Sequence, residues 1–581
     1  MNNSGTIDTP KSADLVTFTV LIEGEELSAT HQVKNIVVEK EINRIPFAQL
    51  AFHDGEAATQ DFLLSNEDLL IPGKKIDIKA GYHNDEESIF QGIIIKHSLK
   101  IRENASVLII ECRDEAVKMT IGRKNSYYYE STDSDIMEEI GGKYELKLDI
   151  ESTEYSHKEL IQYQSSDWDF IMTRAQANGK VCILDNGSLN IAAPNLTEAE
   201  IETVTFGSTL LSFDSEIDAR NQFGTITSYG WNPSEQEIVE AEANDPGVSL
   251  NGNLAAQDLA DVIGLENLEF KHGGNYNSTL LQSWSDAKAL FQQLSRTRGR
   301  IQFQGIAKAK PGTIIKLEGV GDRFNGPVYI SAVRHAVSDG NWTVDAEFGV
   351  NPKWFSETYD VNPMPAAGLL PAINGLQIGV VTQLEEDPDG EERILVQLPI
   401  INSEEQGIWA RVASLDAGEN RGAFFRPEIG DEVIVGFIND DPNHAVVLGM
   451  LHSSAKPAPI VAADDNHEKG FITRSEMKLL FDDDKKSLTI ETPGGKKIVL
   501  DEDAGSIIIE DENSNTFTLD SDGVALESGS DFSIKASGDV TIEGTNVSIA
   551  ANAEFKAEGS AGAEVSTSAI AVLKGSLVQI N

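Results

Sequence analysis

The chain has 581 residues, and its 46 Lys and Arg against 94 Asp and Glu give a formal net charge of −48 at pH 7. A surface this acidic repels phosphate backbones and anionic lipid head groups, which argues against sequence-independent binding to nucleic acid. The length suits roughly three or four domains, and no apolar run approaches the ~20 residues needed to span a bilayer.

The compartment of folding follows from the N-terminus and the two cysteines. Residues 1–20 lack a basic segment followed by an apolar one, so we expect no secretory signal and synthesis in the cytoplasm. Cys112 and Cys182 lie in strand-like apolar segments, which predicts two buried thiols and no disulfide framework.

The first part of the chain combines strand and helix patterns. Apolar and polar residues alternate over 16–22, 75–80, 88–95 and 106–112, a pattern typical of antiparallel strands. Helical spacing appears over 133–140, over 167–178, where Gly179 ends the pattern, and over 283–296. Strand patterns return over 300–303, 313–317, 328–333 and 342–348. We therefore expect a mainly β region with a few helices.

Two proline-rich linkers, 360–374 and 453–460, isolate a block of short strands. Its strand patterns cover 377–383, 393–398, 407–412, 432–437 and 445–450, with Gly- and Asp-rich turns between them. Five short strands of this kind suit a small Greek-key barrel of the OB type. We place this domain at 366–455, followed by a linker at 456–480.

The C-terminal region, 481–581, carries a short repeat. Apolar residues at i and i+2 recur every seven or eight residues from Phe517 onwards, with Gly, Asn, Ser and Asp supplying turns between them. Such a period is typical of a solenoid. The predicted core of this needle consists of Phe517, Leu519, Val524, Leu526, Phe532, Ile534, Val540, Ile542, Val547, Ile549, Ile570 and Val572.

In a single copy of this repeat, the burial of apolar side chains cannot offset the entropy lost on ordering the backbone. Each unit offers two apolar side chains, each stabilising by ~1.5–3 kcal/mol if fully buried. Ordering eight backbone residues costs ~1–2 kcal/mol apiece. Identical chains wound together would share a core and pair their edges, and three chains close the smallest prism. We therefore predict an intertwined triple-stranded β-helix, with a single-chain parallel β-helix as the alternative.

Two segments of the chain carry motifs of a known protein family. Residues 161–179 match a hub motif at Gln164, Ser166, Asp167, Asp169, Phe170, Arg174, Ala175 and Gly179. The barrel segment matches a W-A-R-V strand at Trp409, Ala410, Arg411 and Val412. It also matches a P-x-x-G-D-E-V-x-V-x-F segment at Pro427, Glu428, Gly430, Asp431, Glu432, Val433, Val435 and Phe437. In these motifs the chain resembles the VgrG family of contractile injection spikes.

The resemblance implies a structural, homotrimeric spike that joins baseplate and inner tube to a membrane-puncturing needle. Residues 1–365 would then be a phage-hub-like domain with two β-barrels and an α/β region. Implied partners are tube and baseplate proteins, a PAAR-like tip protein docked on Val578, Ile580 and Asn581, and, transiently, the target membrane. A type VI apparatus, an extracellular injection particle and a phage-like tail all remain open as the delivery system.

Catalytic motifs are missing from the sequence. The ten histidines form no H-E-x-x-H, no C-x-x-C occurs, and no G-x-S-x-G elbow is present. The 453–480 stretch is too short for an inserted lysozyme domain, and we expect no appended effector. We therefore predict no enzymatic activity, no cofactor and no metal site. Two alternatives remain: a spike with cell-wall hydrolase activity and a trimeric receptor-binding tail fibre.

Overall fold

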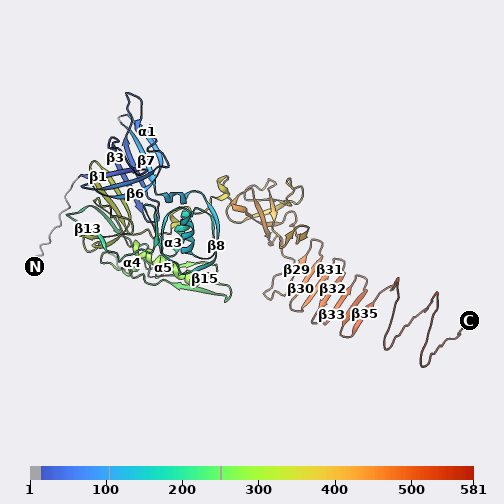
Figure 1. Ribbon diagram of the computed structural model, residues 1–581. Helices are drawn as coiled ribbons and strands as arrows, with labels where there is room; N and C mark the ends of the chain where they lie inside the picture. The colour runs from blue at the N-terminus through green and yellow to red at the C-terminus, as the bar shows by residue number, and fades with distance from the viewer. Residues whose placement is uncertain (1–14, 104, 249–250, 581) are drawn as a thin grey trace. The chain divides into compact units, whose positions relative to one another are not determined.

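The computed structural model describes residues 15–103, 105–248 and 251–580, and the chain divides into two compact units. The first contains the described residues up to Ile373 together with Asn439–Pro442, and the second contains the remainder. We call the first unit the hub. The second contains a barrel and a sheet, which we call the needle sheet (Figure 1).

The hub is built on a sheet of 13 described strands, in the order β14-β18-β21-β20-β3-β4-β7-β6-β5-β1-β2, with β13 and β19 attached through β20. The strands are β1 (Val16–Ile22), β2 (Glu25–Glu26), β3 (Val33–Glu41), β4 (Phe47–His53), β5 (Lys75–Tyr82), β6 (Asp85–Arg102), β7 (Ala105–Arg113), β13 (Glu200–Thr205), β14 (Leu210–Ile217), β18 (Thr297–Gln304), β19 (Ile314–Glu318), β20 (Gly326–Ser338) and β21 (Asn341–Phe348).

Each half of this sheet encloses a separate apolar core. One core gathers Leu50, Phe52 and Phe90 from the first strands, and the other gathers Phe303 and Ile330 from the later ones. The division of this region into two β-barrels stays a prediction. The two halves belong to one hydrogen-bonded sheet, because β20 pairs antiparallel with β3. Cys112 and Cys182 are buried and free, as predicted.

A helical layer with three small sheets completes the hub. The sheet elements are β8 (Lys124–Thr132), β9 (Lys147–Ile150), β10 (Ser156–Ser165), β11 (Val181–Asp185), β12 (Ser188–Ala192), β15 (Thr225–Asn232), β16 (Glu237–Glu242) and β17 (Asn267–Lys271). The helices are α1 (Leu63–Asn66), η1 (Glu115–Thr120), α2 (Asp133–Gly142), α3 (Asp167–Ala177), α4 (Ala256–Ile263), α5 (Ser278–Ser295), α6 (Phe355–Thr358) and η2 (Pro365–Gly368). The three predicted helices correspond to α2, α3 and α5.

The second unit begins with the closed barrel that the sequence predicts. Its strands β22 (Gln377–Gln383), β23 (Ile394–Gln397), β24 (Ile408–Val412), β28 (Ala445–Met450) and β27 (Glu432–Phe437) pair in that order. Alternate side chains of β27 and β28, such as Val433, Val435 and Val447, fill the interior with at most 4% exposure across the core. A small hairpin, β25 (Ala417–Gly418) and β26 (Arg421–Gly422), and the short η3 (Ile438–Asp440) lie in its loops.

The needle sheet follows the barrel as an antiparallel meander of seven strands in chain order (Figure 1). They are β29 (Glu468–Ile472), β30 (Lys478–Asp482), β31 (Ser487–Glu491), β32 (Lys497–Asp501), β33 (Ser506–Glu510), β34 (Thr516–Asp520) and β35 (Gly523–Glu527). The sheet therefore begins within the stretch predicted as a linker, 456–480. Beyond β35 the trace runs back and forth without a strand (Figure 1).

Candidate functional site: the apolar face of the needle

The register of the needle sheet places apolar side chains on one face. Leu479 pairs with Ile490, and Phe481 pairs with Leu488. The same two columns continue strand by strand, because side chains alternate between the faces. This needle face consists of Leu479, Phe481, Leu488, Ile490, Ile498, Leu500, Ile507, Ile509, Phe517, Leu519, Val524 and Leu526.

The opposite face of the same sheet is mixed in character. Lys478 pairs across the strands with Glu491, and their charged groups lie 3.2 Å apart. Lys497 pairs with both Glu491 and Glu510. Opposite charges placed across neighbouring strands stabilise a solvated face. The sheet is therefore amphipathic, and the needle face is the side that must be covered.

Side chains of the needle face are exposed in the described part of the single chain. Phe481 is 44% exposed, Ile490 43%, and Val524 69%. A contiguous exposed apolar surface of this kind marks an interaction site. Phe425 of the barrel stacks on Phe471 of β29 at 5.2 Å between ring centroids, and Arg474 pairs with Glu428 at 2.7 Å. These contacts fix the start of the sheet to the barrel and leave the needle face open.

The apolar pairs continue beyond β35 and are more exposed there. Exposed fractions are 60% for Phe532, 67% for Ile542 and 84% for Ile570. Val578 is 50% and Ile580 85% exposed, whereas Asn581 lies outside the described residues. Of the core residues predicted from sequence, Phe517, Leu519, Val524 and Leu526 belong to β34 and β35, and the other eight follow the last strand.

Eight of the twelve needle-face residues, those from Leu479 to Ile509, are absent from the core predicted from sequence. Between Leu479 and Ile509 the apolar pairs recur at nine or ten residues, so a search for a period near eight starts only at Phe517. The signal was present as i, i+2 pairs such as Leu488/Ile490, with a longer turn between units. The structure extends the predicted core upstream by four pairs.

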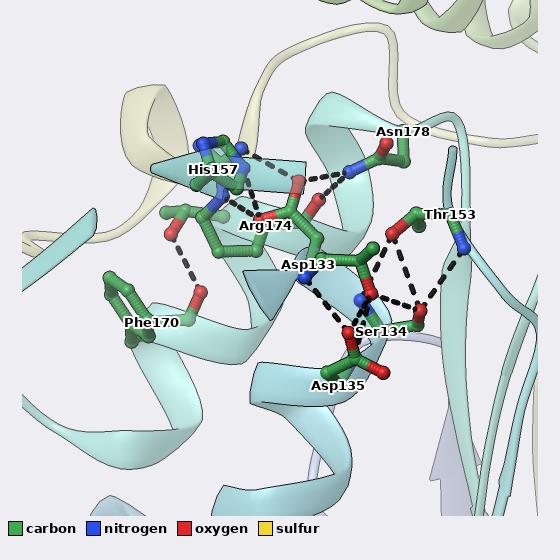
Figure 2. A network of polar contacts seen from close by, with 10 residues as sticks. Asp133, Ser134, Asp135, Thr153, His157, Phe170, Arg174 and Asn178 are labelled. Atoms are coloured by element: carbon green, nitrogen blue, oxygen red, sulfur yellow. Dashed lines mark hydrogen bonds and ion pairs between the residues drawn. The ribbon is translucent and has the colours of Figure 1, made fainter. Parts of the chain in front are cut away.

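A cluster of polar side chains in the hub surrounds the carboxylate of Asp133, which is 1% exposed (Figure 2). Arg174 donates to both its oxygens from Nε and Nη2, at 2.7 and 2.8 Å. Asn178 donates at 2.8 Å, and Nε2 of His157 lies 3.2 Å away. Burial by itself raises the pKa of Asp133, but the hydrogen bonds from His157 and Arg174 outweigh it and hold the pKa well below its usual range.

This cluster connects three secondary-structure elements of the hub. It ties α2, β10 and α3 together, and the carboxylate has hydrogen-bond partners on both oxygens (Figure 2). Ser134, next in the chain, bonds to Thr153 rather than to His157, so the serine and the histidine form no nucleophile–base pair. The arrangement links three elements of the hub fold.

The residues of the hub motif that resembles the VgrG family also make structural hydrogen bonds. Ser166 caps α3 by accepting a hydrogen bond from the backbone of Asp169 at 3.0 Å. Asp167 is buried and accepts hydrogen bonds from Lys124 at 2.6 Å and from Gln162 at 2.8 Å. Gly179 follows the helix with φ +68, a conformation that favours glycine. The motif thus builds and orients α3.

Three observations on the described part of the chain concern metal ions, phosphate groups and membranes. Within residues 15–103, 105–248 and 251–580, no three His, Cys, Asp or Glu side chains are grouped to hold a metal ion. The glycine-rich stretch 319–326 connects β19 directly to β20, without the helix N-terminus on which phosphate cradles depend. No helix in the described part is both long and apolar enough to cross a membrane.

Three family models match successive parts of the chain. Residues 12–339 match the Alg8 N-terminal domain, residues 377–452 the type VI secretion system/phage-baseplate injector OB domain, and residues 487–554 the phage baseplate V C-terminal trimerisation domain. A large β hub, an OB barrel and a trimerisation sheet with an open apolar face define a VgrG-type spike protein of contractile injection systems. The first of these models matches more than half of the chain, so the chain belongs to the Alg8 N-terminal domain family.

Individual relatives match shorter segments. The type VI secretion system spike protein VgrG1b of Pseudomonas aeruginosa is 25% identical over 207 residues, which is 32% of this chain and 27% of that protein. VgrG3 of Vibrio cholerae is 31% identical over 117 residues, 18% of this chain and 11% of that protein. A tail protein of Neisseria meningitidis aligns with a TM-score of 0.43 at 13% identity, covering 58% of this chain and 98% of that one. The matched segments span less than a third of the curated relatives.

Proposed function

We propose that the chain is a force-bearing homotrimeric spike that joins a baseplate and inner tube to a membrane-puncturing needle. The observation that carries this proposal is the open needle face, which runs along the sheet and continues in the exposed pairs up to Ile580. Three such faces close a prism with a dry shared core. The match of residues 487–554 to a trimerisation domain supports three copies.

The oligomeric state of the purified full-length chain tests the proposal. Light scattering is expected to give three times the chain mass of 63.1 kDa. A stable monomer of 63.1 kDa would leave the needle face exposed to water and would refute the shared core. The tube and baseplate proteins would be expected to co-purify with one such trimer per particle, whereas a receptor-binding fibre occurs in several copies.

The spike is proposed to act by stiffness rather than by catalysis. The acidic side chains of the C-terminal region, 15 Asp and Glu against 3 Lys and Arg over residues 501–581, give the outer surface of the shaft its charge. The polar cluster around Asp133 in the hub links secondary-structure elements through hydrogen bonds, as described above. On firing, the spike would be delivered into the envelope of the target cell.

Incubating the trimer with labelled peptidoglycan is expected to release no fragments, and measurable turnover would restore the hydrolase alternative.

The end of the needle is proposed to bind a PAAR-like tip protein through Val578, Ile580 and Asn581. Val578 and Ile580 are 50% and 85% exposed, so they present an apolar end to a partner. Replacing Ile580 by Asp would place three carboxylates on that end, one from each chain, and we expect at least a tenfold loss of affinity, about 1.4 kcal/mol or more. Titration calorimetry with the purified tip protein measures it.

Gln579→Asp is the matched control for the tip-binding experiment, because it adds the same charge at the position that alternates with the two apolar ones. It is expected to bind the tip protein within a factor of about two of the parent chain. Equal losses for Ile580→Asp and Gln579→Asp would show that charge near the end, and not an apolar platform, decides binding.

A further inference from the structure

The sheet formed by β16, β15 and β17 in the hub has an open edge. β17 is the last strand of this sheet and pairs, in parallel, with β15. Flanking the strand, the carbonyl of Glu266 accepts from β15 at 2.8 Å and the N–H of His272 donates to β15 at 3.0 Å. Successive residues direct these groups to opposite sides of a strand, so the N–H and C=O groups of Glu269 and Lys271 point away from β15. Within the described residues, no other backbone group bonds to them.

A pocket with aromatic walls lies beside this edge. The hydroxyl of Ser285 on α5 donates to the hydroxyl of Ser228 on β15 at 2.8 Å, so α5 covers this face of the sheet. Phe270 of β17 pairs with Ser228 across the strands and therefore faces the same side. Phe270, Trp284 of α5 and Trp354 line a cavity of about 310 Å³, at the lower end of the range typical of ligand sites.

Other side chains hold the two tryptophan walls of this pocket in place. The rings of Tyr276 and Trp284 lie 5.0 Å apart between centroids, and those of Phe291 and Trp354 lie 6.4 Å apart. Nζ of Lys288 lies 5.3 Å from the centre of the Trp354 ring. Both tryptophans are half-buried, so each keeps a surface that a ligand can contact. Because the walls are ordered in advance, a ligand would lose little free energy to ordering of the site.

The charge of the pocket is opposite in sign to that of the whole chain. Arg174 and Lys271 line the pocket, and no acidic residue is among the described residues that line it, although the chain carries a net charge of −48. Arg174 is paired with Asp133, whereas the side chain of Lys271 is 66% exposed beside Glu269. Lys271 is therefore the cation that a ligand can reach. This charge favours an acidic ligand, and the acidic surface of a second copy would be repelled by the rest of the hub.

We infer that the hub binds an extended peptide segment of a partner protein, which adds as a strand to the edge of β17 and inserts one aromatic side chain into the pocket. A side chain placed beside Phe270 in the added strand faces the same side of the sheet, and that side opens into the pocket. An acidic residue next to the aromatic one would lie on the face of Lys271. In this mode the backbone hydrogen bonds supply affinity and the pocket supplies specificity. The site lies in the hub and goes beyond the proposed spike function.

Fluorescence anisotropy of a labelled peptide, titrated with the full-length chain, tests this inference. The probe is the fluorescein-labelled hexapeptide Thr-Val-Trp-Glu-Val-Thr, which has strand-forming residues around one aromatic and one acidic side chain. It is expected to bind saturably. The same peptide with serine in place of tryptophan is expected to bind about tenfold more weakly or worse, because it leaves the pocket unfilled. Equal binding of the two peptides would show that the pocket takes no part, and would overturn the inference.

Two pairs of variants separate the pocket from the strand edge. Ser356 is exposed and lines the pocket, so Ser356→Trp fills it from the rim, whereas Thr358→Trp adds the same ring to the same short helix outside the lining. Glu269→Pro removes one outward N–H, and Glu269→Ala removes the same carboxylate but keeps that N–H. Ser356→Trp and Glu269→Pro are each expected to weaken binding about tenfold or more, and both controls are expected to stay within about threefold of the parent chain.

Hydrogen exchange of residues 267–271 separates the possible occupants of the edge. In the full-length chain alone, the amides of Glu269 and Lys271 are expected to exchange rapidly, and the peptide is expected to slow them about tenfold or more. Slow exchange without peptide would mean that a second copy already covers the edge. That result, the lack of saturable binding, or parent-like binding by both Ser356→Trp and Glu269→Pro overturns the inference. Each readout concerns the hub and is separate from the oligomeric state that tests the proposed function.

Discussion

Replacing Val547 and Ile549 together by Asp is expected to convert the full-length chain from trimer to monomer. Both side chains are exposed in the single chain, by 55% and 68%, and belong to the proposed shared core. A trimer would bury six unpaired carboxylates, at an effective cost of several kcal/mol for each ion. That total is larger than the whole stability of an ordinary domain, about 5–15 kcal/mol. Light scattering of the purified variant measures the change.

The control for this prediction adds the same number of charges one position away. Asn546→Asp with Ser548→Asp places carboxylates at the positions that alternate with the apolar pair and face water in the proposed prism. This double variant is expected to remain trimeric. If both double variants dissociate, charge repulsion within an already acidic shaft is the cause. If neither dissociates, Val547 and Ile549 lie outside any shared core.

Replacing Asp133 by Asn is expected to destabilise the hub by about 3–5 kcal/mol at pH 7, because the guanidinium of Arg174 then stays largely buried without its counter-charge. Arg174 is 17% exposed, and its two hydrogen bonds to Asp133 are its direct link to α2. Urea unfolding followed by tryptophan fluorescence measures the loss, because five of the six tryptophans, Trp168 of α3 among them, lie in the hub. Glu139→Gln on the same helix is the control, because its pair with Lys143 is exposed and contributes less than about 1 kcal/mol.

The same pair gives the hub an acid-sensitive stability. The pKa of Asp133 is lowered in the folded protein, so its contribution is complete above the unfolded pKa of about 4 and is lost as the pH falls below it. The difference between the parent chain and Asp133→Asn is therefore expected to be constant from pH 7 to about pH 5 and to shrink below about pH 4. A difference that grows on acidification would contradict the assigned direction.

Local patterns in the sequence were sufficient for α2, α3 and α5 and for the barrel. The caps and apolar spacing of α3 are properties of adjacent residues, and the strands of the barrel alternate in the same local way. The C-terminal repeat could be predicted for the same reason. The pair Val540/Ile542 and its neighbouring pairs form an amphipathic pattern that depends only on adjacent residues. The matched families confirm the resemblance that these residues carried.

Contacts between distant residues could not be read in this way. Arg174 and Asp133 are 41 residues apart, and nothing in either helix pattern identifies them as partners. The pairing of β3 with β20, which joins the two halves of the hub sheet, links segments nearly 300 residues apart. Register over such separations depends on how whole layers pack, and many pairings satisfy the same local alternation.

The sequence alone determined that the C-terminal region is an amphipathic repeat whose apolar pairs no single chain can bury, because that conclusion needs only the period and the residue types. The tertiary structure decided which residues line the upstream part of the repeat and where the in-chain pairing stops. It placed the first strands within the expected linker, added the apolar pairs from Leu479 to Ile509 to the predicted core, and ended the in-chain ladder at Glu527. Hydrogen-bond partners along a chain are set by its three-dimensional path, which residue periodicity leaves undetermined.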